Sequence, residues 1–208
     1  MLTLKKYLSE REVTDFLNIK KSLKEDMITV SCVGLYNHGK STLLNALVKD
    51  FDLKTFKTAD ARETTSNKSI IYKNIKYVDT PGLNIQVKDD QTVMKAIQTS
   101  DITLFVHTLT AGELNKKEVE FLDDIKKHWK DSHELIARTL FVLTRTDKVT
   151  CHEDIANTEN KVKEQIQTVF QSPAVIISTS SNDYIEGMLH DEDELIVESH
   201  IQLLEEKI

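Results

Sequence analysis

The stretch Gly34-Leu35-Tyr36-Asn37-His38-Gly39-Lys40-Ser41 decides the fold of this 208-residue chain, because it reads G-x-x-x-x-G-K-S, the phosphate-binding P-loop pattern. An apolar run precedes it at residues 28–33, and a run with helical spacing follows at 40–49. Strand, loop and helix are the order that the pattern requires. The sequence therefore predicts a nucleotide di- or triphosphate, held with a divalent metal ion, as the ligand.

The loop residues predict specific contacts with phosphate. Glycine lets the backbone turn tightly, and the helix that begins near Gly39 points its free N–H groups at the phosphates. Lys40 can reach the β- and γ-phosphates, and Ser41 offers a hydroxyl to Mg2+. The nucleotide-binding residues expected in this segment are Gly34, Asn37, His38, Gly39, Lys40, Ser41 and Thr42.

Composition bounds the class of protein. The hydrophobic fraction of 39% and the charged fraction of 29% are typical of one soluble globular domain. The net charge of −7 argues against non-specific nucleic-acid binding and against a basic membrane patch. No apolar run approaches the ~20 residues of a membrane span, and the start lacks the features of a secretory signal. Two cysteines make no disulfide framework, so we expect a cytoplasmic protein.

Short apolar runs alternate with longer amphipathic ones, which predicts an α/β fold. A break at Lys73-Asn74 indicates a hairpin, so one edge strand should be antiparallel in a six-stranded, mainly parallel sheet. An extra N-terminal helix is expected over 3–25, giving an extension at 1–27 and a nucleotide-binding domain at 28–208. The expected strands are 28–33, 69–72, 75–79, 102–107, 139–144 and 174–178, and the expected later helices are 40–49, 89–99, 115–130, 153–170 and 191–207.

Two further segments concern the metal and the third phosphate. Asp79-Thr80-Pro81-Gly82 follows a strand, so Asp79 can hold Mg2+ through a water and Gly82 can give its N–H to a γ-phosphate. Thr64 and Thr65 lie in a polar loop, where a threonine can ligate Mg2+ while triphosphate is bound. We favour Thr65, but either residue fits.

The segment Thr144-Arg145-Thr146-Asp147, at the end of another strand, is predicted to bind the base of the nucleotide. A carboxylate at Asp147 can accept hydrogen bonds from N1 and N2 of guanine, and adenine lacks that donor pair. Arg145 can lie over the base, with Thr144 beside it. The expected base-binding residues after the next strand are Ser178, Thr179 and Ser180, whose backbone can reach the guanine O6 atom.

In this order, GLYNHGKS, the Thr of ETTS, DTPG, TRTD and STS resemble the five motifs of the P-loop GTPases. The resemblance covers about residues 28–208 and implies a three-layer G domain that binds GTP or GDP with Mg2+, with helices on both faces of the sheet. NHGKSTLLNAL and DTPGL are similar to the Era-like and dynamin-like branches. The segment at 111–122 and the leading helix favour the dynamin-like branch.

Two departures from the family pattern matter. Arg145 stands where the fourth motif usually has lysine, which puts nucleotide affinity in question. Leu83 stands where Ras-like relatives have a glutamine that orients water. Other residues must therefore supply catalysis beside Lys40, Thr65 and Gly82.

Two sources of catalytic charge fit the sequence. In some Era-like relatives an asparagine at the position of Asn37 helps to bind K+, here with backbone carbonyls near residues 58–63. Arg62 can instead fold back as an arginine finger in cis. His38 can touch a phosphate, although its position favours the outer side of the loop, and we assign it no catalytic role. Cys151-His152-Glu153 is not a metal site, because no second pair lies at metal-ligand spacing.

The leading functional hypothesis is a Mg2+-dependent GTPase with a low intrinsic rate and nucleotide-dependent switching of residues 53–66 and 80–95. One alternative is a nucleotide-binding switch module with negligible hydrolysis. Others are the G domain of a longer dynamin-like membrane protein and an ATPase, against which Asp147 argues. A homodimer across the nucleotide face fits this class, whereas the charge does not indicate ribosome or nucleic-acid binding.

Overall fold

The structure, a computed structural model, describes residues 12–14, 27–56, 68–83, 87–129 and 131–208. Residues 12–14 are helical, and the rest of the helix expected over 3–25 lies outside the described residues. The division at residue 27 therefore stays a prediction. No helix among the described residues is both long enough and apolar enough to cross a bilayer.

A six-stranded sheet forms the centre of the molecule, in the order β2-β3-β1-β4-β5-β6. Antiparallel pairing joins β2 to β3, and every other neighbouring pair is parallel. The prediction of a mainly parallel sheet with one antiparallel edge strand is confirmed. The strands are β1 (Ile28–Gly34), β2 (Lys68–Tyr72), β3 (Ile75–Asp79), β4 (Ile102–Thr108), β5 (Thr139–Thr144) and β6 (Val175–Thr179).

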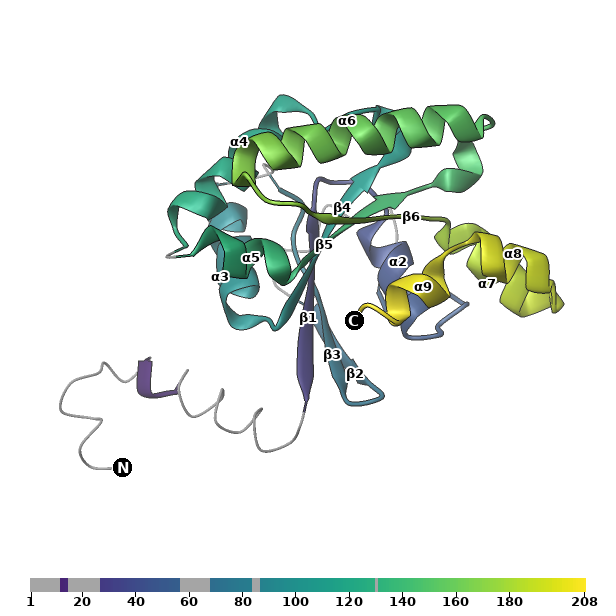
Figure 1. The fold of residues 1–208 in the computed structure, drawn as a ribbon. Coiled ribbons are helices and arrows are strands. Elements are labelled where there is room, and N and C mark those ends of the chain that lie inside the picture. The colour runs from purple at the N-terminus through teal and green to yellow at the C-terminus, as the bar shows by residue number, and fades with distance from the viewer. Residues whose placement is uncertain (1–11, 15–26, 57–67, 84–86, 130) are drawn as a thin grey trace.

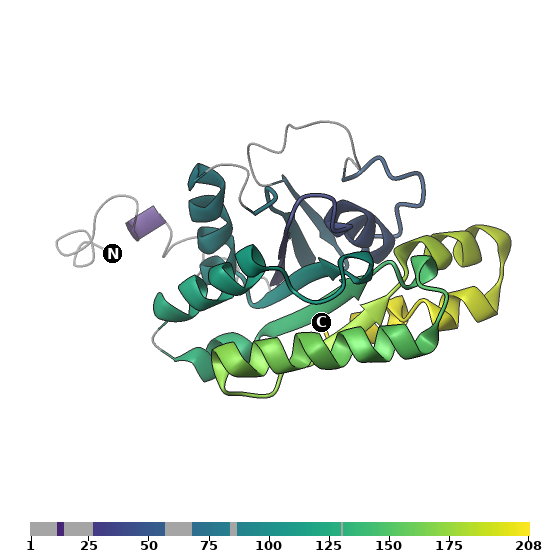
Figure 2. The same ribbon diagram turned by 90° about the horizontal axis from the view of Figure 1, so that it is seen from above.

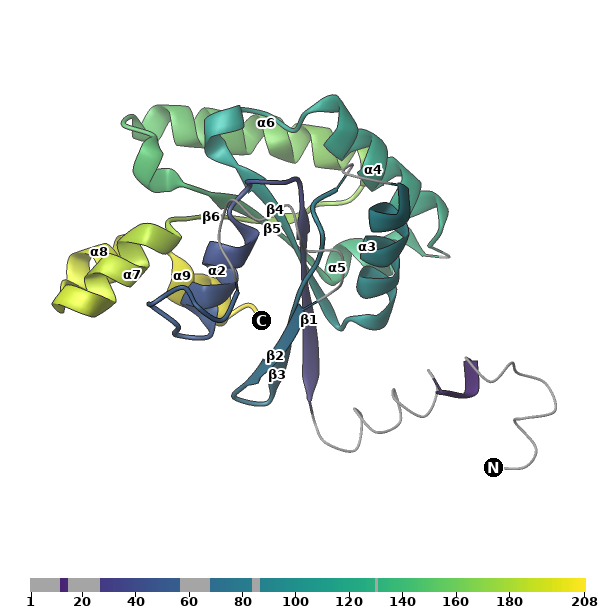
Figure 3. The same cartoon turned by 180° about the vertical axis from the view of Figure 1, so that it is seen from behind.

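Helices cover both faces of this sheet, as Figures 1 and 3 show from opposite sides and Figure 2 from above. One face carries α2 (Lys40–Leu47), α7 (Ser181–His190), α8 (Asp193–Glu198) and α9 (Ile201–Glu205). The other face carries α3 (Val87–Thr99), α4 (Lys116–Lys127), α5 (Ser132–Ala137) and α6 (His152–Phe170). Short 3-10 turns occur at Leu109–Ala111 and Thr146–Lys148.

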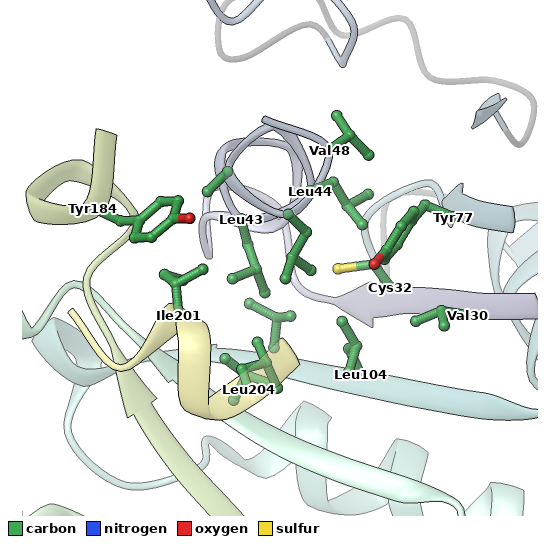
Figure 4. Packing of buried hydrophobic residues seen from close by; sticks show 14 of the residues in the cluster. Val30, Cys32, Leu43, Leu44, Val48, Tyr77, Leu104, Tyr184, Ile201 and Leu204 are labelled. Carbon is green, nitrogen blue, oxygen red and sulfur yellow. The ribbon is translucent and has the colours of Figure 1, made fainter. Parts of the chain in front are cut away.

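Two apolar clusters, one on each face of the sheet, hold these layers together. In the first cluster, Leu43 and Leu44 of α2 pack toward Cys32 of β1, with Ile201 and Leu204 of α9 beside them (Figure 4). All five side chains are fully buried. Because burial of one such side chain contributes roughly 1.5–3 kcal/mol, the cluster anchors the helix that follows the P-loop.

One helix prediction is wrong, and two helices were not predicted. The expected helix 191–207 is two helices, α8 and α9, and neither α5 nor α7 was expected. The break falls at His200, whose backbone is left-handed with φ 55°. Tertiary hydrogen bonds hold the break, because the Ser199 carbonyl accepts from the N–H of Ser180 and His200 Nδ1 lies 3.0 Å from the Ser178 carbonyl.

The parallel strands bring the predicted motifs to one edge of the sheet, because their carboxyl ends all point the same way. The P-loop leaves β1 at Gly34, whose φ is 151°. A Cβ built on this glycine would lie 2.2 Å from the carbonyl oxygen of Val106 on β4. Only glycine therefore lets β1 pass this close to its neighbour and turn into the loop.

Candidate functional site

The P-loop is closed by its own lysine. Lys40 Nζ donates to the carbonyls of Gly34 at 3.0 Å and Leu35 at 2.8 Å. Gly39, with φ 88°, stands at the N-terminus of α2, so the free N–H groups of the first helical turn face the loop. Burial lowers the pKa of Lys40, and the negative charge of nearby Asp79 opposes this shift. An arriving phosphate would stabilise the charged lysine further.

Ser41 and Asp79 form a corner suited to a hard cation. Ser41 Oγ donates to Asp79 Oδ2 at 2.9 Å, and Asp79 Oδ1 is buried with no hydrogen-bond partner in the described part of the chain. Burial raises the pKa of Asp79, while Lys40 and Ser41 act in the opposite direction. An unsatisfied carboxylate oxygen beside a hydroxyl is the ligand chemistry that Mg2+ prefers, so these residues fit the ion.

The segment after β3 lies against the first glycine of the P-loop. Thr80 Oγ1 donates to the Cys32 carbonyl at 2.8 Å, and the N–H of Leu83 donates to the Gly34 carbonyl at 3.2 Å. Leu83 is 2% exposed and belongs to the core. Its side chain anchors the segment, and Gly82 is held beside the P-loop with it.

One pocket connects the P-loop to the predicted base-binding residues. It is lined by Gly39, Thr42, Thr144, Arg145, Asp147, Lys148, Ser181 and Asn182. Gly39 and Asp147 are 108 residues apart in sequence, and the order of the strands brings them to one cavity. A single elongated ligand can therefore contact the loop and the carboxylate together.

Asp147 is held in the acceptor state that a guanine edge requires. Its carboxylate accepts from Ser180 Oγ at 3.1 Å and Asn182 Nδ2 at 3.2 Å, and Lys148 Nζ lies 3.1 Å away. Burial alone would raise the pKa of Asp147, but these contacts outweigh it and lower the pKa below its ordinary value. The group is therefore ionised at neutral pH and only accepts hydrogen bonds.

Arg145 and Thr144 connect this motif to the P-loop backbone. Arg145, left-handed at φ 68°, donates from Nη2 to the Asn37 carbonyl at 2.7 Å. Thr144 Oγ1 donates to the His38 carbonyl at 2.7 Å. The guanidinium of Arg145 and the hydroxyl of Thr144 thus hold two consecutive carbonyls of the P-loop.

The side chains of Ser178, Thr179 and Ser180, at the end of β6, make different contacts. Only Ser180 turns to Asp147, while Ser178 Oγ donates to Glu159 of α6. Thr179 is fully buried, and its Oγ1 has no partner among the described residues. The proposed backbone contact of this segment with the base stays a prediction.

Several predicted residues lie outside the described part of the chain. These are Arg62, Thr64, Thr65 and the carbonyls of residues 58–63. Asn37, the proposed K+ ligand, is exposed, with its backbone at φ 62°. Its role in K+ binding stays a prediction.

The expectation that His38 faces the outer side of the loop is wrong. The residue is 8% exposed and turns inward, with Nδ1 3.3 Å from Glu118 Oε1. The pocket also contains Ser181 and Asn182, which sequence reasoning missed. The pattern Ser180-x-x-Asp183 carries their signal, because serine three residues before an acidic residue marks a helix N-terminus, and Ser180 Oγ caps α7 at Asp183 N–H.

Comparison with known proteins agrees with this geometry. A family model described as 50S ribosome-binding GTPase matches residues 29–180. An uncharacterized protein of Acinetobacter baylyi is 32% identical over 141 residues, which cover 66% of this chain and 32% of that protein. GTPase Der of Finegoldia magna is 27% identical over 196 residues, which cover 87% of this chain and 42% of that protein. The chain thus spans well under half the length of these relatives.

Solved structures share the fold at low sequence identity. The bacterial dynamin GTPase LeoA from ETEC has a TM-score of 0.65 at 15% identity, over 95% of this chain and 38% of that one. Toc33 from Arabidopsis thaliana in complex with GDP and Mg2+ has a TM-score of 0.55 at 15% identity, over 81% and 77% of the two chains.

Proposed function

The chain belongs to the family of 50S ribosome-binding GTPases, and from this premise we propose that it hydrolyses GTP to GDP and phosphate with Mg2+, slowly when alone. The observation that carries the proposal is the pocket shared by Gly39 and Asp147, because it offers a phosphate cradle and a guanine acceptor to one molecule. We further propose that residues 53–66 and 80–95 change conformation with the nucleotide.

Ser41 and Asp79, joined by Thr64 or Thr65, would hold the magnesium ion, which when bound neutralises phosphate charge. Lys40 binds the β- and γ-phosphates and stabilises the charge that develops on the transferred group. The N–H of Gly82 donates to the γ-phosphate, so its segment responds to the third phosphate. We assign the remaining nucleotide contacts to Thr42, Thr144, Arg145 and Asp147, which line the same pocket.

Some group other than residue 83 must position the attacking water and supply positive charge beside the transferred phosphate. Leu83 has an apolar side chain, and its burial at 2% exposure keeps it away from solvent. We propose Asn37 with K+, Arg62 in cis, or a residue of a partner as that source. Equal GTPase rates in KCl and NaCl would eliminate K+, and full turnover in Arg62→Ala would eliminate the arginine.

A nucleotide-binding switch with negligible hydrolysis is the second candidate, and the buried Leu83 is the observation that favours it. A G domain within a longer dynamin-like membrane protein is compatible with either activity, since the chain spans 38% of LeoA.

We also propose a cytoplasmic location, supported by two cysteines that are both free thiols.

Calorimetry with GDP, GTP and ATP, with and without Mg2+, tests the ligand. We expect tight GDP and GTP binding, no ATP binding, and a loss of the Mg2+ effect in Ser41→Ala. Single-turnover hydrolysis at low and high protein concentration then separates the candidates. Measurable turnover supports the GTPase, whereas tight binding without turnover at any concentration supports the switch.

Partners are proposed on the same basis. For the chloroplast translocon components atToc33 and psToc159, dimerization is described as important for the GTPase activity, and that solved structure has a TM-score of 0.59 with this chain. We propose a homodimer across the nucleotide face, which predicts a specific rate that rises with protein concentration. The net charge of −7 disfavours direct contact with ribosomal RNA.

A further inference from the structure

Three ionisable side chains from separate parts of the chain meet behind the P-loop. They are His38 of the loop, His107 of β4 and Glu118 of α4, and one ligand atom from each lies within 4.8 Å of the other two. The two imidazole rings stand nearly perpendicular, at 77°, with centroids 5.1 Å apart. His107 and Glu118 are 1% and 0% exposed at the side chain. A cluster of this kind is costly to bury unless its charges are matched.

The hydrogen bonds of His107 determine which of its nitrogens carries a proton. Its Nε2 lies 2.9 Å from the carbonyl of Gly112, and a carbonyl can only accept, so Nε2 is the donor. In neutral His107 the lone pair is therefore on Nδ1, which lies 2.9 Å from Glu118 Oε1.

Glu118 is an acceptor as well. Its second oxygen, Oε2, accepts the N–H of Asn115 at 3.0 Å in the capping box of α4. A lone pair of His107 and a carboxylate oxygen cannot remain this close without a positive charge between them, which is either a proton or a metal ion.

His38 favours the metal ion. Its Nδ1 lies 3.3 Å from the same Glu118 Oε1, is buried, and has no hydrogen-bond partner among the described residues. A single proton between His107 and Glu118 serves two atoms and leaves this third atom unsatisfied. A metal ion accepts lone pairs from all three atoms at once.

We propose that His38, His107 and Glu118 bind one Zn2+ ion, at a site separate from the Ser41–Asp79 corner. Two imidazole nitrogens and one carboxylate oxygen are zinc chemistry, and Mg2+ prefers oxygen ligands alone. Each of two ligands is also held by a hydrogen bond on its other side. The Gly112 carbonyl accepts from Nε2 of His107, and the N–H of Asn115 donates to Oε2 of Glu118. Contacts of this kind orient zinc ligands. Three protein ligands leave a fourth position open for water.

An ion in this place would connect the P-loop to α4. The carbonyl of His38 is already held by Thr144, so a bound side chain would fix the residue from both ends. Residues 37–39 would then have less freedom to lose when nucleotide binds. Where the proposed nucleotide binding holds, Zn2+ should therefore tighten GDP binding, and this second effect rests on that proposal.

The test uses the untagged 208-residue chain, freed of metal with a chelator and returned to excess Mg2+ without nucleotide. Titration with zinc sulfate in a calorimeter should give one equivalent of tight binding. Co2+ should produce the intense visible absorption of a four-coordinate site. Neither readout depends on GTP, so the failure of this proposal is distinguishable from that of the proposed GTPase activity.

Two variants remove ligands with little change in shape. His38→Phe removes a nitrogen ligand, and Glu118→Gln keeps an acceptor for the α4 cap but loses the charge. Each should weaken Zn2+ binding by more than about 100-fold. The matched control His190→Gln, on the exposed surface of α7, should bind as the parent does.

Circular dichroism confirms that each variant is folded before it is compared. The proposal is overturned if the folded parent chain takes up no stoichiometric Zn2+, which would mean that a proton holds the cluster. It is also overturned if His38→Phe and Glu118→Gln, both folded, bind Zn2+ as tightly as the parent.

Discussion

Arg145 joins two motifs of the site that lie 108 residues apart along the chain. Its guanidinium donates at 2.7 Å to the carbonyl of Asn37 in the P-loop. A long cationic side chain is what this contact needs, and lysine of the usual motif could make a single such bond. The departure from the family pattern therefore keeps the contact and adds further donors on a planar group.

Arg145→Ala should raise the Kd for GDP about 10-fold, because a charge-assisted hydrogen bond to the loop backbone contributes roughly 1.5 kcal/mol. The Kd of Arg145→Lys for GDP should stay within about 3-fold of the parent value, because replacing the arginine contact by a lysine contact would cost only ~0.6 kcal/mol of binding free energy. Calorimetry with GDP and Mg2+ measures both variants. Unchanged affinity in Arg145→Ala would show that the contact is not coupled to the nucleotide.

Asp147→Asn should weaken GDP binding by about 100-fold and favour xanthosine diphosphate. The amide of asparagine offers one donor and one acceptor, which match the C2 oxygen and N1–H of xanthine but not the two donors of guanine. Competition between the two nucleotides measures the preference. Asp154→Asn, an exposed carboxylate on α6, is the control and should retain the parent's preference.

At the scale of elements, α7 completes the base-binding end of the site. Its N-cap Ser180 and its second residue Asn182 both hydrogen-bond to Asp147, so the position of the helix determines the orientation of that carboxylate. Helix α8 packs closely against α7 at Gly187. The sequence pattern did not predict α7 because serine and asparagine at its start are equally typical of loops.

Gly187→Ala should destabilise the protein by about 1–2 kcal/mol. A Cβ at this position would lie 2.8 Å from Ile196 Cγ1 and 2.9 Å from the carbonyl of Glu192, so overpacking should exceed the gain of about 1 kcal/mol in helix propensity. Urea unfolding measures the change. Glu186→Ala, exposed one residue earlier, should change stability by less than about 0.5 kcal/mol. A gain in stability from Gly187→Ala would contradict the close packing of α7 and α8.

At the scale of the whole molecule, the phosphate-binding end and the base-binding end of the site both lie on one rigid sheet. Apolar clusters on both faces bury the helices that carry them, and the pocket lies where β1, β5 and β6 end. A ligand that contacts both ends binds only the folded chain. Ligand binding should therefore stabilise the entire domain rather than one loop.

GDP with Mg2+ at 100 times its Kd should add about 2.7 kcal/mol of stability and raise Tm by about 5–10 °C. ATP at the same concentration should leave Tm unchanged. Thermal unfolding with each nucleotide, repeated in Asp147→Asn, measures the shift. An equal rise with ATP, or a rise with GDP that persists in Asp147→Asn, would contradict base recognition through Asp147.

The sequence by itself determined the elements whose residues are contiguous. The P-loop, the hairpin at β2 and β3 and the succession of strands and helices along the chain follow from local backbone chemistry and from apolar periodicity, which neighbouring residues carry. The same local information predicted one helix over 191–207, where tertiary hydrogen bonds to the end of β6 impose a break at His200.

Only the tertiary structure decided which distant side chains meet. Arg145 reaches Asn37, Asn182 reaches Asp147, and the cluster at residues 38, 107 and 118 forms because β1 and β4 are neighbours and α4 packs beside them. No spacing along the chain encodes these contacts, since they depend on the order and register of strands that pair across the sheet. Which side chains meet in this way can be identified only from the folded structure.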